Sequence, residues 1–574
     1  MKKIFSIFCS IVFVSALLVG CGQDTNQSNG EDNPSTEKPT DPVAITILQE
    51  FNDGWVRNLN PFIADAYQVV QGFMYEPLVI FDTLNNSKET MWLAEDVISE
   101  PDNKTLTIKV RQGIKWSDGE EFNAEDVAFS YTIFKDHPTI DRGGMWGENG
   151  KLESVTIVDD YTVQIVMKEE NRFHRNDVLY QRWIVPEHIW KDVEDPATYV
   201  MTDAVVTGAF SEVKSFTPEM MVFSRNPYYW KADELKIDEL RVAQANSNDA
   251  ALSLLQTGSI DWAHIFIPNI EDTYVKGDTH KKYWYGMNDA VRISFNYATK
   301  NEDNLKAFND AEFKKAASMA VDRQGIIDSA VYGYLDSKVP ANTGLPPALF
   351  GWENEEAMNT NVENTTYDLE AAKKVLADAG YVDVDNDGFV ENPDGTKIAF
   401  EIVSPAGWSD WNAGAEMAAA GMREIGINAT PKAIDLGLVI ETWESGNHDA
   451  LYGGYGLNSN IWKFYFDTIG DDSRVLTSTW WSVCQTNYVN DEINAMIAEM
   501  PTASDERLAE IVTYVEQYFA ENMINIPVLY NGNWFVYNDS RFTGWATKDN
   551  PFVQPANCQH DTKILQLLAL EPVE

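Results

Sequence analysis

Hydrophobic and polar residues alternate along some stretches of the chain and recur at helical spacing along others. Alternation predicts half-buried strands over residues 106–110, 154–158 and 162–167. Spacing of three and four predicts amphipathic helices over residues 124–136, 250–257, 310–320 and 368–379. Asn123 is the expected N-cap of the first helix, and Asn248 or Asp249 that of the second.

One region has the order of a parallel βαβ unit. A strand over 397–403, a helix over 412–425 and a second strand starting within 426–430 follow one another. Parallel strands need a crossover, and a helix commonly supplies it. We therefore expect an α/β fold in at least one lobe.

The first 21 residues have the layout of a lipoprotein signal. Lys2 and Lys3 precede an apolar run over 4–17, and Leu18-Val19-Gly20-Cys21 follows it. Cleavage before Cys21 and lipidation of its thiol are the prediction, with residues 1–20 as signal peptide. A membrane-spanning anchor is the alternative, but the run is shorter than the ~20 residues that a span needs. The remaining chain is then held by lipid alone at the outer face of a bacterial membrane.

A polar segment separates this cysteine from the first apolar strand. Residues 22–43 contain no large apolar side chain before Val43, so they bury too little surface to order the backbone. We expect a disordered tether over 21–43 and a folded body from Ala44 onwards. Two or three lobes fit the length that remains.

Net charge limits the possible binding partners, and the cysteines allow at most one disulfide in the mature chain. The net charge is −46, and removal of Lys2 and Lys3 leaves −48, which argues against nucleic acid and anionic lipid as partners. Cys484 and Cys558 could pair outside the cytoplasm or remain buried thiols. There is no CxxC pair.

Several short motifs follow one another in a recognisable order. The densest is Lys115-Trp116-Ser117-Asp118-Gly119, followed by Ala124-Glu125-Asp126-Val127. The others are Leu59-Asn60-Pro61, Tyr75-Glu76-Pro77-Leu78, Thr207-Gly208-Ala209-Phe210, Arg225-Asn226-Pro227-Tyr228-Tyr229-Trp230, Gly258-Ser259-Ile260-Asp261, Ala320-Val321-Asp322-Arg323 and Ile526-Pro527-Val528-Leu529-Tyr530. The ordered set resembles the extracellular solute-binding proteins of family 5, the oligopeptide, dipeptide and nickel receptors of ABC importers.

The resemblance implies a fold and a set of partners. The fold is a two-lobed periplasmic-binding-protein type II clam-shell, α/β in class, with an additional inserted lobe. The implied boundaries are 44–75, 205–290 and 530–574 for the first main lobe, 76–204 for the inserted lobe and 291–529 for the second main lobe. The implied partners are ABC permease and ATPase subunits, for a monomer that requires no cofactor. Asp118, Gly119, Glu125 and Asp126 are expected to serve turn geometry and helix capping rather than ligand binding.

Aromatic residues in polar contexts are the candidate ligand contacts. The chain has 18 Trp, and an indole offers a flat apolar face with one N–H. The predicted ligand-binding residues are Trp55, Trp146, Trp408, Asp410, Trp411, Asn458, Trp462 and Trp481. Core packing is the alternative for each tryptophan.

The ligand class rests on one departure from the family pattern. Asn458 and Asn460 stand where peptide receptors of this family often carry an acid for the ligand's amino terminus, and an amide supplies no charge for an ammonium. The stretch Gly407-Trp408-Ser409-Asp410-Trp411 also looks like the family's oligosaccharide-binding branch. We therefore favour an oligosaccharide slightly over an oligopeptide.

A loop rich in acids has the spacing of a calcium site. Its oxygen donors are Asp383, Asp385, Asp387, Glu391 and Asp394, with Gly388 at the sixth position. The loop predicts a structural Ca²⁺; an Asx-rich surface turn without an ion is the alternative.

Other function classes lack a motif here. A secreted glycoside hydrolase needs two carboxylates ~5–9.5 Å apart, which the sequence neither identifies nor excludes. GxSxG, HExxH and P-loop motifs are missing from the sequence. We expect no enzyme; a ligand sensor of the same fold is a further alternative.

Overall fold

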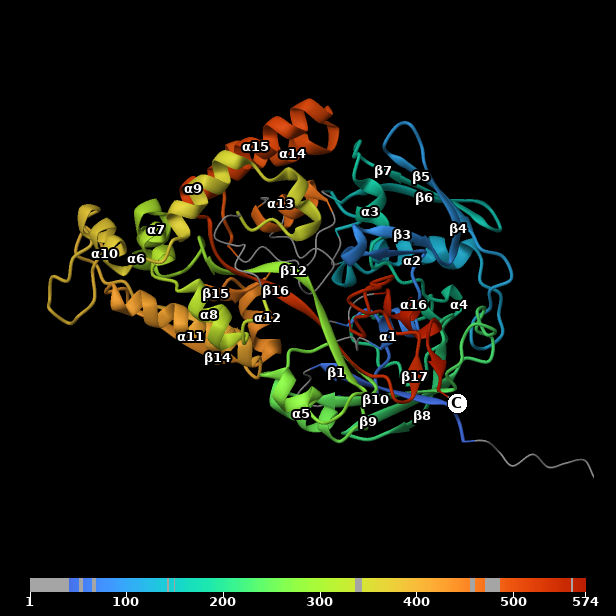
Figure 1. Ribbon diagram of the computed structural model, residues 1–574. Coiled ribbons are helices and arrows are strands. Elements are labelled where there is room, and N and C mark those ends of the chain that lie inside the picture. Colours follow the sequence, from blue (N-terminus) through green and yellow to red (C-terminus); the bar gives the residue numbers. More distant parts are fainter. Residues whose placement is uncertain are drawn as a thin grey trace, which may run out of the picture. The chain divides into compact units, whose positions relative to one another are not determined.

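A ten-stranded mixed sheet, in the order β14-β13-β15-β12-β16-β11-β1-β10-β9-β8, is the largest element of the protein (Figure 1). The computed structural model describes residues 41–50, 55–63, 69–141, 144–148, 150–335, 343–454, 460–469, 486–558 and 561–573. Among these residues, no helix combines the length and apolar character needed to cross a membrane.

Two long antiparallel strands join the halves of this sheet. β12 (Lys281–Phe295) pairs with β16 (Asn525–Asn538) along most of its length, with irregularities between Met287 and Ala290 and between Val291 and Arg292. β12 also pairs with β15 on one side, while β16 pairs with β11 on the other. One half of the sheet therefore extends from β12 and the other half extends from β16.

The first half holds the N-terminal strand and forms the first main lobe. β1 pairs in parallel with β10 and β11, whereas β8, β9 and β10 are antiparallel neighbours. Its elements are β1 (Ala44–Glu50), β8 (Phe210–Phe216), β9 (Met220–Arg225), β10 (Glu239–Ala245), α5 (Asn248–Gln256), β11 (Trp262–Ala263) and the π-helical segment Glu271–Val275. The C-terminal pieces are β17 (Phe542–Thr543), α16 (Lys563–Leu568) and β18 (Glu571–Pro572).

The second half carries most of the helices and forms the second main lobe. β13 (Phe400–Pro405) pairs in parallel with β14 (Ala429–Ile434) and β15 (Ala450–Gly453), and α11 (Ser409–Glu424) connects β13 to β14. This is the predicted βαβ unit. The other helices are α6 (Glu302–Asn309), α7 (Ala311–Met319), α8 (Arg323–Ala330), α9 (Glu355–Thr365), α10 (Leu369–Asp378), α12 (Leu436–Glu444), α13 (Ile461–Ile469), α14 (Asp491–Glu499), α15 (Asp505–Asn522) and the 3₁₀ segments Pro347–Trp352 and Met500–Thr502.

An antiparallel sheet in the order β4-β5-β7-β6 forms the inserted lobe. Its elements are β2 (Val79–Asp82), β3 (Lys88–Met91), β4 (Ala94–Ser99), β5 (Thr105–Val110), α2 (Ala124–Asp136), β6 (Leu152–Asp159), β7 (Thr162–Met167), α3 (His174–Leu179), α4 (Glu187–Trp190) and the 3₁₀ segments Thr83–Asn85 and Pro138–Ile140. The short helix α1 (Val70–Phe73) precedes it. The architecture confirms the predicted fold class, while the domain boundaries stay predictions.

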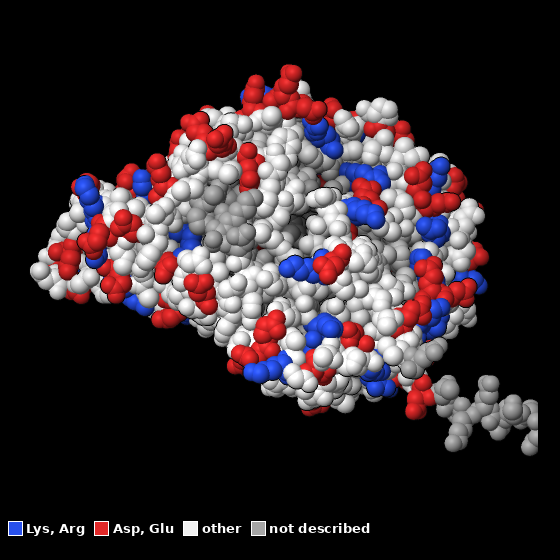
Figure 2. Space-filling model, in the orientation of Figure 1, with Lys and Arg blue, Asp and Glu red and all other residues white. Residues whose placement is uncertain are grey.

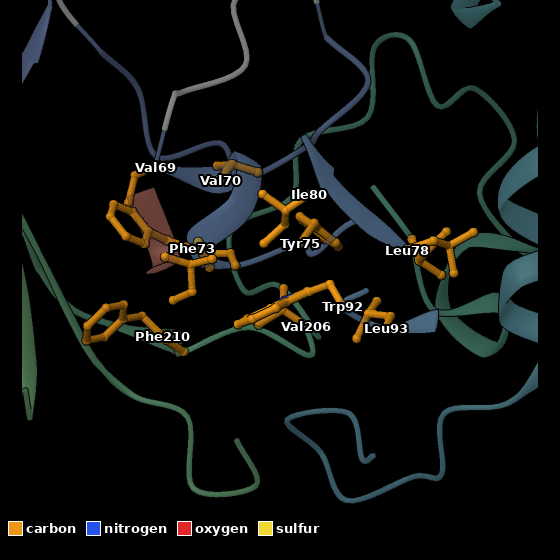
Figure 3. Close-up of a cluster of buried hydrophobic side chains, with 14 of the residues drawn as sticks. Val69, Val70, Phe73, Tyr75, Leu78, Ile80, Trp92, Leu93, Val206 and Phe210 are labelled. Carbon is orange, nitrogen blue, oxygen red and sulfur yellow. The ribbon is translucent and has the colours of Figure 1, made fainter. Parts of the chain in front are cut away.

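One hydrophobic core spans the inserted lobe and the first main lobe. Figure 3 shows its centre, where Phe73 and Trp92 from the chain before the four-stranded sheet lie close to Val206 and Phe210 from well after it. All four side chains are at most 2% exposed. Buried apolar surface of this extent is the main favourable term in folding, so it fixes the inserted lobe on the first.

The family motifs pack against one another through buried polar groups. Glu76 accepts hydrogen bonds from the indoles of Trp92 (2.7 Å) and Trp230 (3.2 Å). The amide of Asn226 donates to the carbonyl of Gly208 (2.9 Å), and the guanidinium of Arg323 donates to that of Pro527 (2.8 Å). These motif residues therefore satisfy buried backbone and side-chain groups, as buried polar groups require.

The Asp118 and Asp126 turns confirm the structural role expected of them. Asp126 forms a capping box with Asn123, and its carboxylate also accepts from the Trp116 indole (3.0 Å). Gly119 has φ +98°, and Asp118 accepts from the Glu120 amide (3.2 Å). The cap predicted for the second helix is wrong: α5 begins at Asn248, and the Ser247 hydroxyl accepts from the Ala250 amide (3.1 Å).

Candidate functional site

The carboxyl ends of the parallel strands are where an α/β fold places a ligand. In the first main lobe these are the ends of β1, β10 and β11; in the second, the ends of β13 and β15. The two sets meet, because the Asn248 amide donates to the Gly407 carbonyl (3.2 Å) and its side chain donates to the Ser409 hydroxyl (2.9 Å). The turn after β13 therefore touches the start of α5.

That turn needs glycine at its first position. Gly407 has φ +87°, and a Cβ there would lie 2.9 Å from the Asn246 carbonyl oxygen of the other lobe. Both the backbone conformation and the close approach exclude larger residues. Trp408 follows as the N-cap residue of α11, so this close approach fixes where α11 begins.

Trp408 lies at the junction of the two main lobes. Its half-buried ring packs against the hydrophobic core of the second main lobe and against that of the first. It meets Trp411 edge to face, with ring centroids 4.7 Å apart and planes at 77°. Trp411 is 7% exposed and packs in the second lobe's core beside Tyr452. Trp408 is therefore the more accessible of the two rings.

Asp410 is buried in the first turn of α11. Burial raises the pKa of its carboxyl to about 6, although the backbone N–H groups of Asp410 and Trp411 and the Asn248 amide favour the charged form. A carboxylate at a helix N-terminus is also stabilised by the helix dipole. Asp410 can accept hydrogen bonds near neutral pH and lose its charge in mild acid.

The other predicted tryptophans that the structure describes have partners elsewhere in the fold. The Trp55 indole donates to the Thr217 carbonyl (3.1 Å), and that of Trp146 donates to the Tyr131 carbonyl (2.7 Å) inside the inserted lobe. Trp462 is 7% exposed. Its ring stacks on Phe173, with centroids 5.9 Å apart. The structure thus brings together Trp408, Asp410 and Trp411; Asn458, Trp481 and Cys21 lie outside the described residues.

The acidic loop holds three of its five predicted ligands close together. Carboxylate oxygens of Asp383, Asp385 and Glu391 lie within 4.8 Å of one another. The Lys397 ammonium is 2.6 Å from Asp385 and 2.7 Å from Asp387, so this cation already offsets part of the charge. Three oxygen donors suit a hard cation such as Ca²⁺.

The last predicted ligand of that loop has another partner. The carboxylate of Asp394 lies 2.7 Å from the Lys306 ammonium and also accepts from the Thr396 hydroxyl (2.6 Å). These groups hold the pKa of Asp394 well below its usual range, at about 2. The loop thus divides into a three-carboxylate group and a separate ion pair at its twelfth position.

A second aromatic group, missed in the sequence, covers one face of the long strands. Trp534 on β16 lies 5.1 Å from both Phe266 and Tyr285, measured between ring centroids, and 6.3 Å from Tyr334. Tyr332, whose ring centroid lies 6.1 Å from that of Tyr334, is 45% exposed. The alternation of Tyr283 and Tyr285 along β12 was the available signal, because residues two apart share a face of a strand.

A buried contact between a cysteine sulfur and an imidazole was also missed. Cys558 is 3% exposed, with its sulfur 2.8 Å from His264 Nδ1; Nε2 of the same ring meets Asn533 Oδ1. Cys484 lies outside the described residues, so a disulfide with Cys558 and two buried thiols both stay predictions. Spacing gave no signal, because the three residues are far apart in the chain.

Comparison with known proteins gives consistent results. A family model described as "Bacterial extracellular solute-binding proteins, family 5 Middle" matches residues 88–475. The oligopeptide-binding protein AppA of Bacillus subtilis is 22% identical over 550 residues, covering 92% of this chain and 95% of its own.

Two solved structures extend the comparison. A periplasmic oligopeptide-binding protein of Thermotoga maritima, solved with bound mannohexaose, has a TM-score of 0.82 at 25% identity and covers 93% of this chain and 99% of its own. The structure of AppA from Bacillus subtilis with a nonapeptide has a TM-score of 0.74 at 19% identity, covering 93% and 100%. The second similarity bears on fold alone.

Proposed function

The chain belongs to the bacterial extracellular solute-binding proteins of family 5, and on that premise we propose that it captures an extended oligosaccharide for import. It is the substrate-binding component of an ABC importer for peptides or oligosaccharides, delivering its ligand to permease and ATPase subunits. Lipidation of Cys21 would hold it at the outer face of the membrane.

One observation carries the preference for sugar. The mannohexaose-bound protein resembles this chain over 93% of its length with a TM-score of 0.82. Its ligand is a neutral, extended oligomer of the kind inferred from the tryptophans and from Asn458. The half-buried Trp408, at the junction of two lobes, supplies an aromatic ring where such an oligomer would lie.

A peptide is the second candidate. The Bacillus subtilis relative is named an oligopeptide-binding protein and matches 92% of this chain. Asp410, two residues after Trp408, would be the candidate counter-ion for an ammonium there. Burial of that carboxyl raises its pKa to about 6, which weakens it as a counter-ion in mild acid. This is the reason to place peptide second.

The test is a titration with intact ligands. Mannohexaose is compared with tri- to pentapeptides and a nonapeptide by calorimetry and by Trp fluorescence. We expect a sugar to bind and Trp408→Ala to weaken that binding by ~1–3 kcal/mol, as loss of one stacking face does elsewhere. Trp408→Phe keeps an aromatic face and should recover most of it. Trp146→Phe, inside the inserted lobe, is the control.

The outcomes separate the candidates. Peptide binding with no response to any sugar would show that the ligand is a peptide, and the role in import would stand. Recovery of intact mannohexaose after long incubation is expected, because we infer binding without turnover; time-dependent cleavage would favour the glycoside hydrolase alternative. Permease and ATPase genes beside this one would favour an importer over a sensor.

A further inference from the structure

The inserted lobe and the second main lobe touch through residues at the start of α3 and along α13 (Figure 1). The ring of Phe173 stacks on Trp462, with planes only 7° apart. Trp462 belongs to the core cluster of α13, α14 and α15, and Phe173 packs against that same cluster. An aromatic side chain of one lobe therefore completes the hydrophobic surface of another.

Two buried ion pairs lie beside this stack, one from each lobe. Lys151 and Asp177 of the inserted lobe are 2.7 Å apart, and their side chains are 17% and 2% exposed. Lys463 pairs with Asp467 on α13, with side chains 17% and 1% exposed. Burial alone would raise the pKa of Asp177, but Lys151 and Lys463 together lower it below its usual range. The positive charge of one lobe thus stabilises a carboxylate of the other.

Each pair is neutral within its own lobe, and contact between the lobes adds the attraction between Lys463 and Asp177. The two ammonium groups and two carboxylates offset one another's charge, and the buried guanidinium of Arg182 is a further cation close to Asp177. Separation of α3 from α13 would return both pairs to water and expose the faces of Phe173 and Trp462.

Arg172, the residue before Phe173, makes further contacts between the inserted lobe and the second main lobe. The Arg172 backbone amide donates to the Pro501 carbonyl (3.0 Å), and its guanidinium donates to the Ala503 carbonyl (3.0 Å). The guanidinium also lies 2.5 Å from Asp505, the first residue of α15. Arg172 therefore bonds three groups across the lobe boundary. Figure 2 shows the molecule in the orientation of Figure 1, and its surface is hollowed near the middle of this view.

We propose that the stack, the paired charges and the Arg172 contacts form a clasp that holds the lobes closed and sets how long a ligand is retained. The strands β12 and β16 allow the main lobes to move relative to one another, as hinge-type closure requires. Contacts made only when the lobes meet lower the free energy of the closed form. The apparent affinity then follows the closed fraction.

The experiment compares the Arg172–Asp505 pair with the Arg175–Glu89 pair, because Arg175 lies three residues after Arg172 in the chain, on α3. Arg172→Glu places a negative charge against Asp505, and Arg172→Glu with Asp505→Arg restores the pair with its charges exchanged. Arg175→Glu is the control, because Arg175 bonds Glu89 (2.6 Å) and stays inside the inserted lobe. Phe173→Ala tests the stack. Melting curves identify any variant that fails to fold.

Small-angle scattering of the protein without added ligand gives the first readout. We expect Arg172→Glu and Phe173→Ala to increase the radius of gyration, Arg175→Glu to leave it unchanged, and the charge exchange to restore it in part. Equal radii for wild type, Arg172→Glu and Phe173→Ala would overturn the clasp.

Ligand retention gives the second readout and rests on the proposed function. Mannohexaose should dissociate about three- to tenfold faster from Arg172→Glu than from wild type, the range that an ion pair and its hydrogen bonds supply. If mannohexaose dissociates from Arg172→Glu as slowly as from wild type and from Arg175→Glu, the clasp is also overturned. If wild type binds no mannohexaose, the proposed ligand fails, and the scattering comparison alone decides the clasp.

Discussion

Neutralising Glu76 should remove a large part of the pH dependence of stability. This carboxyl is fully buried beneath the indoles of Trp92 and Trp230. Burial raises the pKa of Glu76 from 4.5 to about 7, against the hydrogen bonds that favour its charged form. At about 1.36 kcal/mol per pH unit, ionising it inside the fold costs about 3 kcal/mol.

The direction follows from where the proton is bound. Below pH 4.5 the carboxyl is protonated in both states, whereas between 4.5 and about 7 the folded protein holds a proton that the unfolded chain has lost. The unfolded state then binds fewer protons, so the free energy of unfolding falls as pH rises through this window. Above about pH 7 the Glu76 carboxyl is ionised in both states, and it causes no further fall in the free energy of unfolding.

Glu76→Gln should abolish this contribution. Glutamine keeps one carbonyl oxygen for an indole N–H and turns its amide toward the other, a cost of about 1–3 kcal/mol that does not vary with pH. Urea unfolding at pH 5 and pH 8 should therefore show the variant gaining about 2.5 kcal/mol relative to wild type between the two. Other buried acids, such as Glu516 and Asp561, cancel in this difference.

A matched control separates burial from charge. Glu120 is exposed on the same lobe, so Glu120→Gln should follow the wild-type pH dependence. Parallel stability curves for wild type and Glu76→Gln would refute the reasoning, because a carboxyl that titrates alike in both states carries no such dependence.

Three further predictions follow from other sites. Arg323→Met should lower the free energy of unfolding by about 3–5 kcal/mol in urea titrations, since its guanidinium donates to four buried carbonyls that the variant would leave unsatisfied; Arg507→Met, which removes an exposed ion pair, should leave the free energy of unfolding nearly unchanged. If the acidic loop binds calcium, a chelator should lower the melting temperature and Asp385→Ala should remove that response, whereas Asp394→Ala should keep it; identical curves with and without chelator would leave a surface turn. Cys21→Ala should leave the protein uncleaved or released from membranes, and a cleaved variant still bound there would contradict a lipid anchor.

Local chemistry explains what could be predicted from the chain. α2 was predicted with its bounds and its N-cap because Asn123 and Asp126 satisfy the first backbone N–H groups within four residues. The βαβ unit followed from adjacent segments, since a parallel pair needs a crossover. Ser247 was missed as a cap because three neighbouring polar residues can each fill that role.

The candidate site was predicted only where its residues are neighbours in sequence. Trp408, Asp410 and Trp411 lie together because they share one turn and the first residues of one helix. Trp462 was predicted to contact ligand, yet the structure stacks it on a ring of another lobe. A tryptophan in a polar context looks the same in sequence whether a ligand or a distant phenylalanine covers it.

The sequence by itself determined the βαβ unit, helix α2 with its N-cap, the net acidic charge and the family, because these depend on residues near one another in the chain, on composition or on short motifs. Tertiary structure alone decided which buried charges meet. Arg323 reaches a carbonyl 204 residues away, and the Cys558 sulfur meets an imidazole 294 residues away. Such contacts form when the lobes pack, and no local propensity encodes a partner that only the folded chain brings near.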